Sequence, residues 1–276
     1  MKNLLNMFLI WIVVGISCYS QSNTHSTDIS RYQTQNGDRI KFVSKILNEE
    51  REVYIGLPNH YNSSLEYPVI LVLEGETVFE SFAPITRLMA QVNEIPPCIV
   101  VGIPVFNKMY IEYAPVITGI PESGNADKML EHYRLELFPL LDSLYSCSGD
   151  KLIWSHSALG GTFCTYLLLS PDNQFTGILS SSPNFKFVRE YIEKENAFEQ
   201  LSKKGEIFYY LTFGGNEAEE YMGSMFDGVK SFAAKLENES PDNLNWKYVV
   251  NENNNHFTNA VETYIDGVML YFNERK

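Results

Sequence analysis

The chain has 276 residues, of which 45% are hydrophobic and 13% are aromatic, so it can bury a full core without disulfides or a structural metal. Its formal net charge of −13 repels nucleic acids and anionic membranes, which excludes both as expected partners. The cysteines Cys98, Cys147 and Cys164 have no paired CxxC spacing, which argues against a disulfide framework and a zinc site. We expect no metal and no cofactor.

The first 20 residues have the features of a secretory signal. Lys2 gives a positive start, residues 4–16 form an apolar run, and small residues precede Gln21. The run is short for a membrane span, but an uncleaved anchor is an alternative, and a lipid on Cys18 is another. Cleavage after residue 20 would remove one charged residue, Lys2, and change the formal charge from −13 to −14. We therefore expect an exported protein, either periplasmic or secreted.

The next residues predict a flexible leader and then one domain. Residues 21–37 are polar, and the domain is expected to span residues 38–276. Residues 39–47 and 51–57 alternate between apolar and polar types on either side of a turn at residues 48–50. This pattern predicts an antiparallel hairpin at the start of the domain.

Short apolar runs then alternate with longer amphipathic stretches. The runs suit strands covered on both faces: residues 69–73, 98–103, 152–154, 177–179 and 207–213. The amphipathic stretches predict helices at residues 79–92, 126–145 (with a kink at Pro139), 160–169, 221–236 and 260–272. The alternation predicts an α/β fold with a mostly parallel central sheet and helices on both faces. Only residues 181–206 separate two of the strands, so any cap over a site should be small.

The most informative stretch, residues 151–163, has the sequence KLIWSHSALGGTF. An apolar strand leads into Ser157, and two glycines open a helix, which is the strand–turn–helix order of a nucleophile elbow. Such a turn strains the backbone of its central residue, lifts the hydroxyl clear of the sheet, and aims a helix N-terminus at a forming oxyanion. Ser157 is therefore the candidate nucleophile, and a helix N-cap serine is the alternative.

This stretch departs from the usual GxSxG pattern. Ser155 and Leu159 stand where the two glycines are expected. Either Ala158 acts as a one-residue insertion and the glycine roles pass to Gly160 and Gly161, or the elbow is remodelled.

A serine that attacks an ester needs an imidazole to take its proton. Residues 246–264 predict a last strand, a polar loop and the start of the final helix, and His256 lies at the end of that loop. That is where the chain order serine, acid, histidine places the base. A surface loop histidine is the alternative. His156 is interpreted as a packing residue, since it would point away from the adjacent Ser157.

The imidazole needs a carboxylate to fix its tautomer. The strand at residues 207–213 is followed by two glycines and then by three candidate acids, Glu217, Glu219 and Glu220. Glu217 is the first within reach, although each of the three also suits the N-terminus of the helix that follows.

An oxyanion needs two amide donors. One is expected from Ala158 N–H, next to the nucleophile, and the other from Glu76 N–H, in the loop after the strand that runs into Gly75. A plain turn after that strand is the alternative.

With these residues in place, the chain resembles the putative-esterase family of α/β-hydrolases, which includes esterase D, feruloyl and acetyl-xylan esterases, mycolyltransferases and siderophore trilactone esterases. The likeness runs from about Ile40 to the C-terminus and is carried, in order, by EEREVYIGLPNHY, YPVILVLEGE, IPPCIVVGIP, SGNADKMLEHYRLELFPLLD, SHSALGG, FTGILSSSP and NHF. It implies the α/β-hydrolase fold, Ser157 as nucleophile, His256 as base and Glu217 as acid, with oxyanion amides from Glu76 and Ala158.

Members of the siderophore branch often carry an arginine-rich stretch where this chain has FNKMYIEYAP, which keeps only Lys108. Some of them work without a clear acid. The resemblance implies a serine esterase that hydrolyses a small carboxylic ester, such as a siderophore or an acylated sugar, through an acyl-enzyme. A non-catalytic binding protein on the same fold, motivated by the altered elbow, and an acyltransferase are the alternatives.

Overall fold

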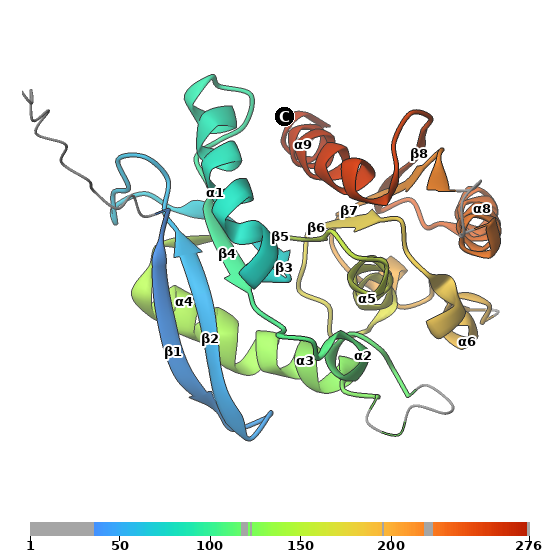
Figure 1. The fold of residues 1–276 in the computed structure, drawn as a ribbon, viewed down its shortest axis with the longest axis horizontal. Coiled ribbons are helices and arrows are strands. Elements are labelled where there is room, and N and C mark those ends of the chain that lie inside the picture. Colours follow the sequence, from blue (N-terminus) through green and yellow to red (C-terminus); the bar gives the residue numbers. More distant parts are fainter. Residues whose placement is uncertain (1–35, 117–120, 122, 195, 218–222, 275–276) are drawn as a thin grey trace, which may run out of the picture. The chain divides into compact units, whose positions relative to one another are not determined.

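The computed structural model describes residues 36–116, 121, 123–194, 196–217 and 223–274. In these residues, eight strands form one sheet in the order β1-β2-β4-β3-β5-β6-β7-β8 (Figure 1). The expected signal at residues 1–20 lies outside the described residues, as does nearly all of the expected leader.

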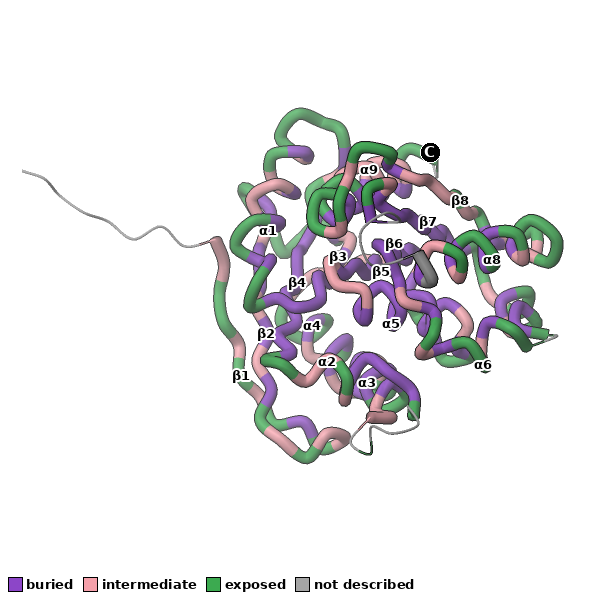
Figure 2. Tube along the Cα trace, turned by 45° about the vertical axis from the view of Figure 1, so that its right-hand side comes forward, coloured by how far each residue is buried: buried purple, intermediate pink, exposed green. Residues whose placement is uncertain are grey.

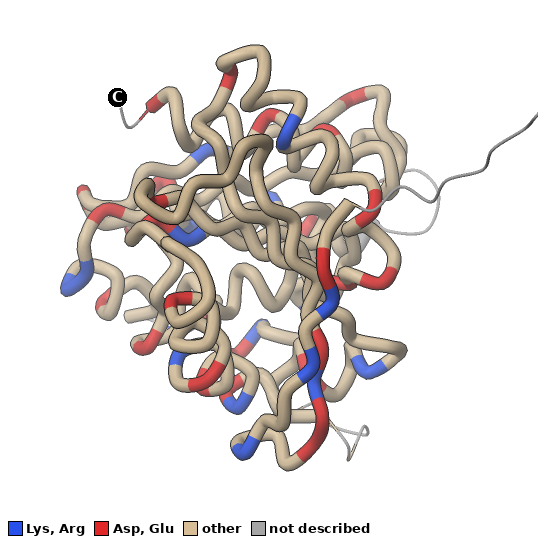
Figure 3. Tube along the Cα trace, turned by 90° about the vertical axis from the view of Figure 1, so that its left-hand side faces the viewer, with Lys and Arg blue, Asp and Glu red and all other residues tan. Residues whose placement is uncertain are grey.

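The sheet begins with an antiparallel hairpin, as predicted. β1 (Asp38–Ser44) pairs with β2 (Glu49–Gly56), and β2 is also antiparallel to β4. Figure 3 shows acidic and basic positions interspersed along this hairpin, and Lys41 Nζ lies 2.9 Å from Glu50 Oε1 across it. Charged side chains on an edge strand discourage further strand pairing.

The remaining strands are parallel: β3 (Tyr67–Leu73), β4 (Ile99–Ile103), β5 (Cys147–Ser155), β6 (Gly177–Ser181), β7 (Ile207–Gly214) and β8 (Leu244–Asn251). Successive residues of β3 enter two separate cores, with Ile70 in one and Leu71 in the other. Figure 2 shows the central strands buried between layers of chain. The continuous apolar runs therefore are strands covered on both faces, and the predicted α/β-hydrolase architecture is confirmed.

Helices cover both faces of the sheet (Figure 1). One core receives side chains from α1 (Gly75–Gln91) and α9 (His256–Glu274). The other receives side chains from α3 (Ala126–His132), α4 (Phe138–Leu144), α5 (Ala158–Leu169) and α8 (Gly223–Glu239), and from the short α6 (Arg189–Ile192). The four-residue helix α2 (Met109–Glu112) follows β4.

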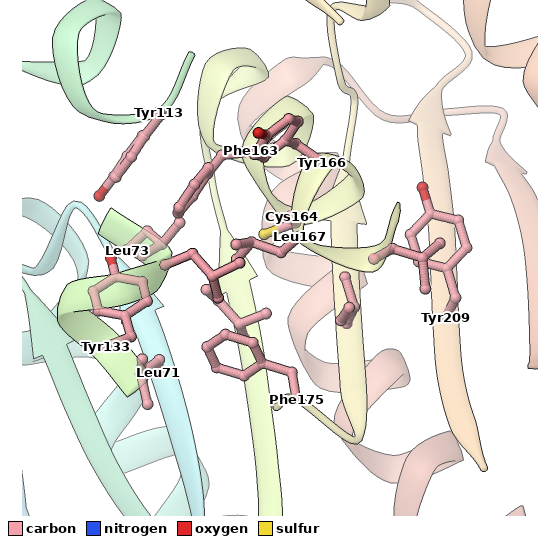
Figure 4. Close-up of a cluster of buried hydrophobic side chains, with 14 of the residues drawn as sticks. Leu71, Leu73, Tyr113, Tyr133, Phe163, Cys164, Tyr166, Leu167, Phe175 and Tyr209 are labelled. Carbon is pink, nitrogen blue, oxygen red and sulfur yellow. The ribbon is translucent and has the colours of Figure 1, made fainter. Parts of the chain in front are cut away.

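Helix α5 is the most deeply enclosed of these elements, and its residues from Leu159 to Leu168 are all buried. Its Phe163 ring stacks on Tyr113 with ring centroids 5.0 Å apart (Figure 4). Thr165 Oγ1 lies 2.7 Å from Tyr209 Oη on β7. These contacts hold the middle of α5 against the core and the sheet.

Several helices begin earlier than their apolar pattern predicts. The helices expected from residues 79, 160 and 260 begin at Gly75, Ala158 and His256, because the first turn of each is polar or glycine-rich and carries little periodicity. The helix expected over residues 126–145 contains a π-helical segment, Tyr133–Leu137, immediately before α4. Leu137 and Phe138 have helical backbone angles, so the helix continues through Pro139, whose missing N–H removes one intrahelical hydrogen bond.

Two features are absent from the described residues. No helix there has both the length and the apolar character needed to cross a membrane. No group of three or more His, Cys, Asp or Glu side chains there is arranged to hold a metal ion.

Glu136 ties the β1–β2 turn to the helical layer. Its carboxylate accepts from Ser44 Oγ at 2.5 Å and from the backbone N–H groups of Lys45 and Ile46 at 2.7 and 3.2 Å, and lies 2.7 Å from His132 Nδ1. Burial raises the pKa of Glu136, but these hydrogen bonds outweigh burial and lower the pKa to about 2 from 4.5. The ionised carboxylate therefore stabilises the fold above about pH 4.5, and this contribution is lost as the pH falls towards 2.

We predict that Glu136→Gln lowers the free energy of unfolding by about 1–3 kcal/mol near neutral pH, because the charged acceptor is lost. The difference from wild type should shrink in acid, where the wild-type carboxylate also becomes protonated. Urea unfolding at a series of pH values measures both effects. Glu66→Gln, in an exposed loop, controls for loss of a charge. A difference that grows as the pH falls would contradict the assignment.

Candidate active site

The candidate residues follow parallel strands that end at the same edge of the sheet. Ser157 lies two residues after β5, Glu217 three residues after β7, and His256 five residues after β8. The carboxyl ends of parallel strands meet at one edge, where α/β folds bind their ligands. The topology therefore gathers the residues that the sequence singled out.

The backbone at Ser157 differs from the predicted strained elbow. Its φ and ψ are −104° and 154°, an extended conformation, and it is the N-cap of α5. Its carbonyl accepts the N–H of Gly161 at 2.8 Å, and its Oγ accepts the N–H of Gly160 at 3.0 Å. The prediction of strain at Ser157 is wrong because α5 begins directly at Ala158 and Ser157 adopts normal cap geometry.

The glycine pair lies where close approach requires it. A Cβ on Gly160 would lie 1.8 Å from Ser155 Oγ, and a Cβ on Gly161 would lie 2.4 Å from the carbonyl oxygen of Ser181. Gly160 and Gly161 thus stand at the close contacts that the glycines of GxSxG usually make, which was the first of the two sequence hypotheses. The backbone before them also differs from the usual elbow, which was the second.

His256 and Glu217 lie together. His256 Nδ1 is 2.7 Å from Glu217 Oε2, and the Glu217 side chain is 2% exposed. The other carboxylate oxygen, Oε1, accepts from Ser182 Oγ at 2.6 Å and from the N–H of Gly214 at 3.0 Å. A carboxylate on Nδ1 favours the tautomer whose Nε2 is free to act as a base. Of the three candidate acids, Glu217 has this geometry; Glu219 and Glu220 lie outside the described residues.

A buried amide on α9 supports this pair. Asn259 is fully buried, and its Nδ2 donates to Ser182 Oγ at 2.7 Å and to Thr212 Oγ1 at 3.1 Å. Its Oδ1 accepts from Asn251 Nδ2 at 2.8 Å. Asn259 also donates to Ser181 Oγ at 3.2 Å, so it links the ends of β6, β7 and β8 three residues after His256 on α9. Sequence reasoning missed Asn259 and Ser182, although both lie in or near segments that carry the family resemblance.

The Ser157 hydroxyl does not contact His256 in the described structure. Ser157 Oγ donates instead to Glu74 Oε1 at 2.9 Å. Glu74 directly follows β3, is the N-cap of α1, and is 3% exposed. It was not a candidate from sequence, because it stands between an apolar strand and the expected oxyanion loop.

His156 does more than pack. Its Nδ1 lies 3.1 Å from Glu74 Oε2, and its side chain is 21% exposed. The interpretation of His156 as a packing residue is therefore incomplete, since it also contacts a buried carboxylate.

The two expected oxyanion donors stand at helix N-termini. Ala158 is the first residue of α5, and Glu76 is the second residue of α1. The strands before these helices, β5 and β3, are neighbours in the sheet. N–H groups in the first turn of a helix lack intrahelical acceptors and suit an anion. The Glu76 carboxylate accepts from the N–H groups of Val105 and Phe106 at 3.1 and 2.8 Å, which ties this loop to the end of β4.

The segment between β6 and β7 is short, as expected of a small cap, and its described residues include three short helical turns: Phe185–Phe187, α6 and Leu201–Lys203. It begins beside α5, where Asn184 N–H donates to the carbonyl of Ala158 at 3.3 Å. A cavity of about 550 Å³ lies between this segment and α8. Its lining combines the buried side chains of Phe185, Ile192 and Phe232 with charged ones: Lys186, Arg189, Glu193, Asp227 and Lys235.

Comparison with known proteins gives the family. Residues 44–257 match the model of the family described as "Putative esterase". The match covers most of the chain, so the chain belongs to this family of α/β-hydrolases.

Individual relatives are more distant. Ferri-bacillibactin esterase BesA of Bacillus subtilis is 24% identical over 225 residues, which are 72% of this chain and 77% of BesA. Among solved structures, the IroE-like serine hydrolase of Shewanella oneidensis superposes with a TM-score of 0.73 at 26% identity, covering 87% of this chain and 81% of that one. The BES protein of Bacillus cereus gives the same TM-score at 22% identity, covering 89% and 99%. The predicted membership of the putative-esterase family is confirmed, and siderophore esterases are among the relatives.

We predict that Gly160→Ala lowers the free energy of unfolding by about 1–3 kcal/mol, because the added methyl group overlaps Ser155 Oγ. Urea denaturation measures the change. Gly149→Ala on β5 is the matched control, since a Cβ there meets nothing within 4 Å, and it should change stability by less than about 0.5 kcal/mol. Equal midpoints for the two variants would show that the close approach at Gly160 is not a constraint.

Proposed function

We propose that this chain is a serine esterase that hydrolyses a small carboxylic ester through an acyl-enzyme, with Ser157 as nucleophile, His256 as base and Glu217 as the acid that orients it. The observation that carries the proposal is the 2.7 Å contact between His256 Nδ1 and a buried Glu217 carboxylate, at the sheet edge that also bears Ser157. Membership of the esterase family supports the same reaction class.

Acylation begins with the Ser157 hydroxyl turned towards His256 Nε2. Oγ attacks the ester carbonyl carbon while Nε2 takes the hydroxyl proton, and Glu217 stabilises the imidazolium through Nδ1–H. The carbonyl oxygen becomes an oxyanion that accepts from the N–H groups of Ala158 and Glu76. The intermediate collapses as the C–O bond to the alcohol breaks and His256 returns its proton to the leaving oxygen.

Deacylation repeats these steps with water. Water gives a proton to His256 Nε2 and attacks the acyl carbon, and the bond to Ser157 Oγ then breaks. His256 returns the proton to Oγ, so the free acid leaves and the enzyme is regenerated. Neither half of the cycle needs a metal or an organic cofactor.

The proposed substrate is a small uncharged ester. Lys108, the cation in the stretch where siderophore esterases often carry arginines, has its Nζ 2.7 Å from Glu49 Oε2. This pairing and the chain's net charge of −13 disfavour a highly anionic ferric complex.

A non-catalytic binding protein on the same fold is the second candidate. It is favoured by one observation, that Ser157 Oγ donates to Glu74 Oε1 and caps α5. A fluorophosphonate forms a covalent bond only with an activated serine, so labelling of Ser157 discriminates between the two candidates.

We predict that Ser157→Ala lowers the turnover of p-nitrophenyl acetate or butyrate by about a thousandfold or more. Loss of the α5 cap should cost about 0.5–2 kcal/mol of stability without unfolding the protein. The same variant should abolish fluorophosphonate labelling. Ser143→Ala, at an exposed position on α4, is the matched control and should keep wild-type turnover. Unchanged hydrolysis in Ser157→Ala would reject Ser157 as nucleophile.

We predict that Glu217→Gln lowers kcat by about a hundredfold or more, because an amide cannot stabilise the imidazolium and favours the wrong tautomer. KM should change little, since Glu217 is buried behind His256 and does not reach substrate. Steady-state kinetics separates the two constants, and Glu239→Gln on the exposed end of α8 controls for loss of a charge. A change confined to KM would exclude this role for Glu217.

A further inference from the structure

Glu74 has an unusual backbone for a buried side chain. Its φ and ψ are 51° and 44°, in the left-handed region, and it lies at the N-cap of α1 without using its carboxylate to cap that helix. A non-glycine residue in this region carries a conformational cost, and such residues cluster at functional sites. The strain expected at Ser157 is thus found at Glu74, between β3 and α1.

The Glu74 carboxylate is held by hydroxyl groups and a histidine. Oε1 accepts from Ser157 Oγ at 2.9 Å, and Oε2 accepts from Ser155 Oγ at 2.8 Å and lies 3.1 Å from His156 Nδ1. A Cβ on Gly160 would lie 2.7 Å from Oε1, so the carboxylate also packs closely against the start of α5. Burying a carboxylate without a full cation partner is costly, which indicates a role beyond packing.

The Ser157 hydroxyl has one proton to donate, and two groups could accept it: the Glu74 carboxylate and His256 Nε2. In the structure it donates to Glu74, whereas the proposed reaction needs it to donate to His256. Hydrogen bonds to a charged acceptor are stronger than those to a neutral one. The contact with Glu74 therefore opposes the reactive arrangement.

We infer that Glu74 is a positioning residue that holds the Ser157 hydroxyl in a resting orientation, in competition with His256. This inference rests on the proposed esterase function. A fraction of the protein has Ser157 turned to His256 at any moment, and the Glu74 bond sets that fraction. The carboxylate also places a negative charge near the carbonyl group that Ser157 attacks. Its repulsion of the oxyanion that forms on the carbonyl oxygen further slows the attack.

We predict that Glu74→Gln increases the second-order rate of fluorophosphonate labelling of Ser157 by about fivefold to tenfold, the factor expected when a charged acceptor becomes neutral. The amide keeps the size of the side chain and removes its charge. Glu80→Gln is the matched control, because Glu80 lies on the same helix, is exposed, and bonds to Asn36. That control should be labelled at the wild-type rate. Thermal unfolding of each variant, measured beside the labelling rates, shows whether the variant is folded.

Two further variants separate competition from a structural effect. In a His256→Ala background, Glu74→Gln should give no increase, because the released hydroxyl then has no base to reach. Glu74→Asp keeps the charge but shortens the side chain by one methylene group, so it weakens the contact with Oγ and should also increase labelling. This variant tests the inference if Glu74→Gln fails to fold.

Three outcomes are decisive. Faster labelling of Glu74→Gln that depends on His256 supports the inference. If wild type is labelled and folded Glu74→Gln is labelled at the same rate or more slowly, the inference is wrong and the esterase function stands. If neither protein is labelled, the proposed function fails, and the resting role of Glu74 fails with it.

Discussion

The candidate site is built around two buried carboxylates that are satisfied by hydroxyl groups and histidines. Glu217 contacts Ser182 and His256, and Glu74 contacts Ser157 and His156. Elsewhere in the described chain, the buried carboxylate of Glu112 is paired in the usual way, with the Arg51 guanidinium at 2.6 and 3.1 Å. A carboxylate held by a strong cation is electrostatically neutralised, whereas one held by serine and histidine keeps its influence on the protons around it. This difference distinguishes Glu74 and Glu217 from Glu112, whereas the half-buried Glu136 of the scaffold also has a serine and a histidine as partners.

The fold could be predicted from sequence because its strands are continuous apolar runs and its helices have a clear period. The position of β4 between β2 and β3 could not, since periodicity says which faces are buried and nothing about which strands are neighbours. Helix starts were missed for a related reason. The first turns of α1 and α9 carry Glu76 and His256, residues that serve the site, so those turns lack the apolar pattern from which a helix is predicted.

The candidate site residues also divide into those with a local sequence signal and those without one. Ser157 and His256 were predictable, because an elbow and a final loop have local sequence features. Glu217 was one of three candidate acids, and its contact with His256 distinguishes it. Glu74, Ser182 and Asn259 were not predictable, since each acquires its contacts from strands far away in the sequence. The family resemblance contains the segments that bear two of them, yet a resemblance assigns roles only where the motif itself is catalytic.

Two residues separate Ser157 from Gly160, one more than in GxSxG, and this affects how the direction of the Ser157 hydroxyl is set. A strained elbow holds its hydroxyl away from the sheet by backbone geometry alone. Here the backbone of Ser157 is relaxed and extended, so the direction of Oγ depends on its hydrogen-bond partners. A cap hydrogen bond of this kind contributes about 1 kcal/mol, and the bond to Glu74 adds to it. Under the proposed function, the direction of the Ser157 hydroxyl depends on a competition between the side chains of Glu74 and His256 and not on the main chain of an elbow.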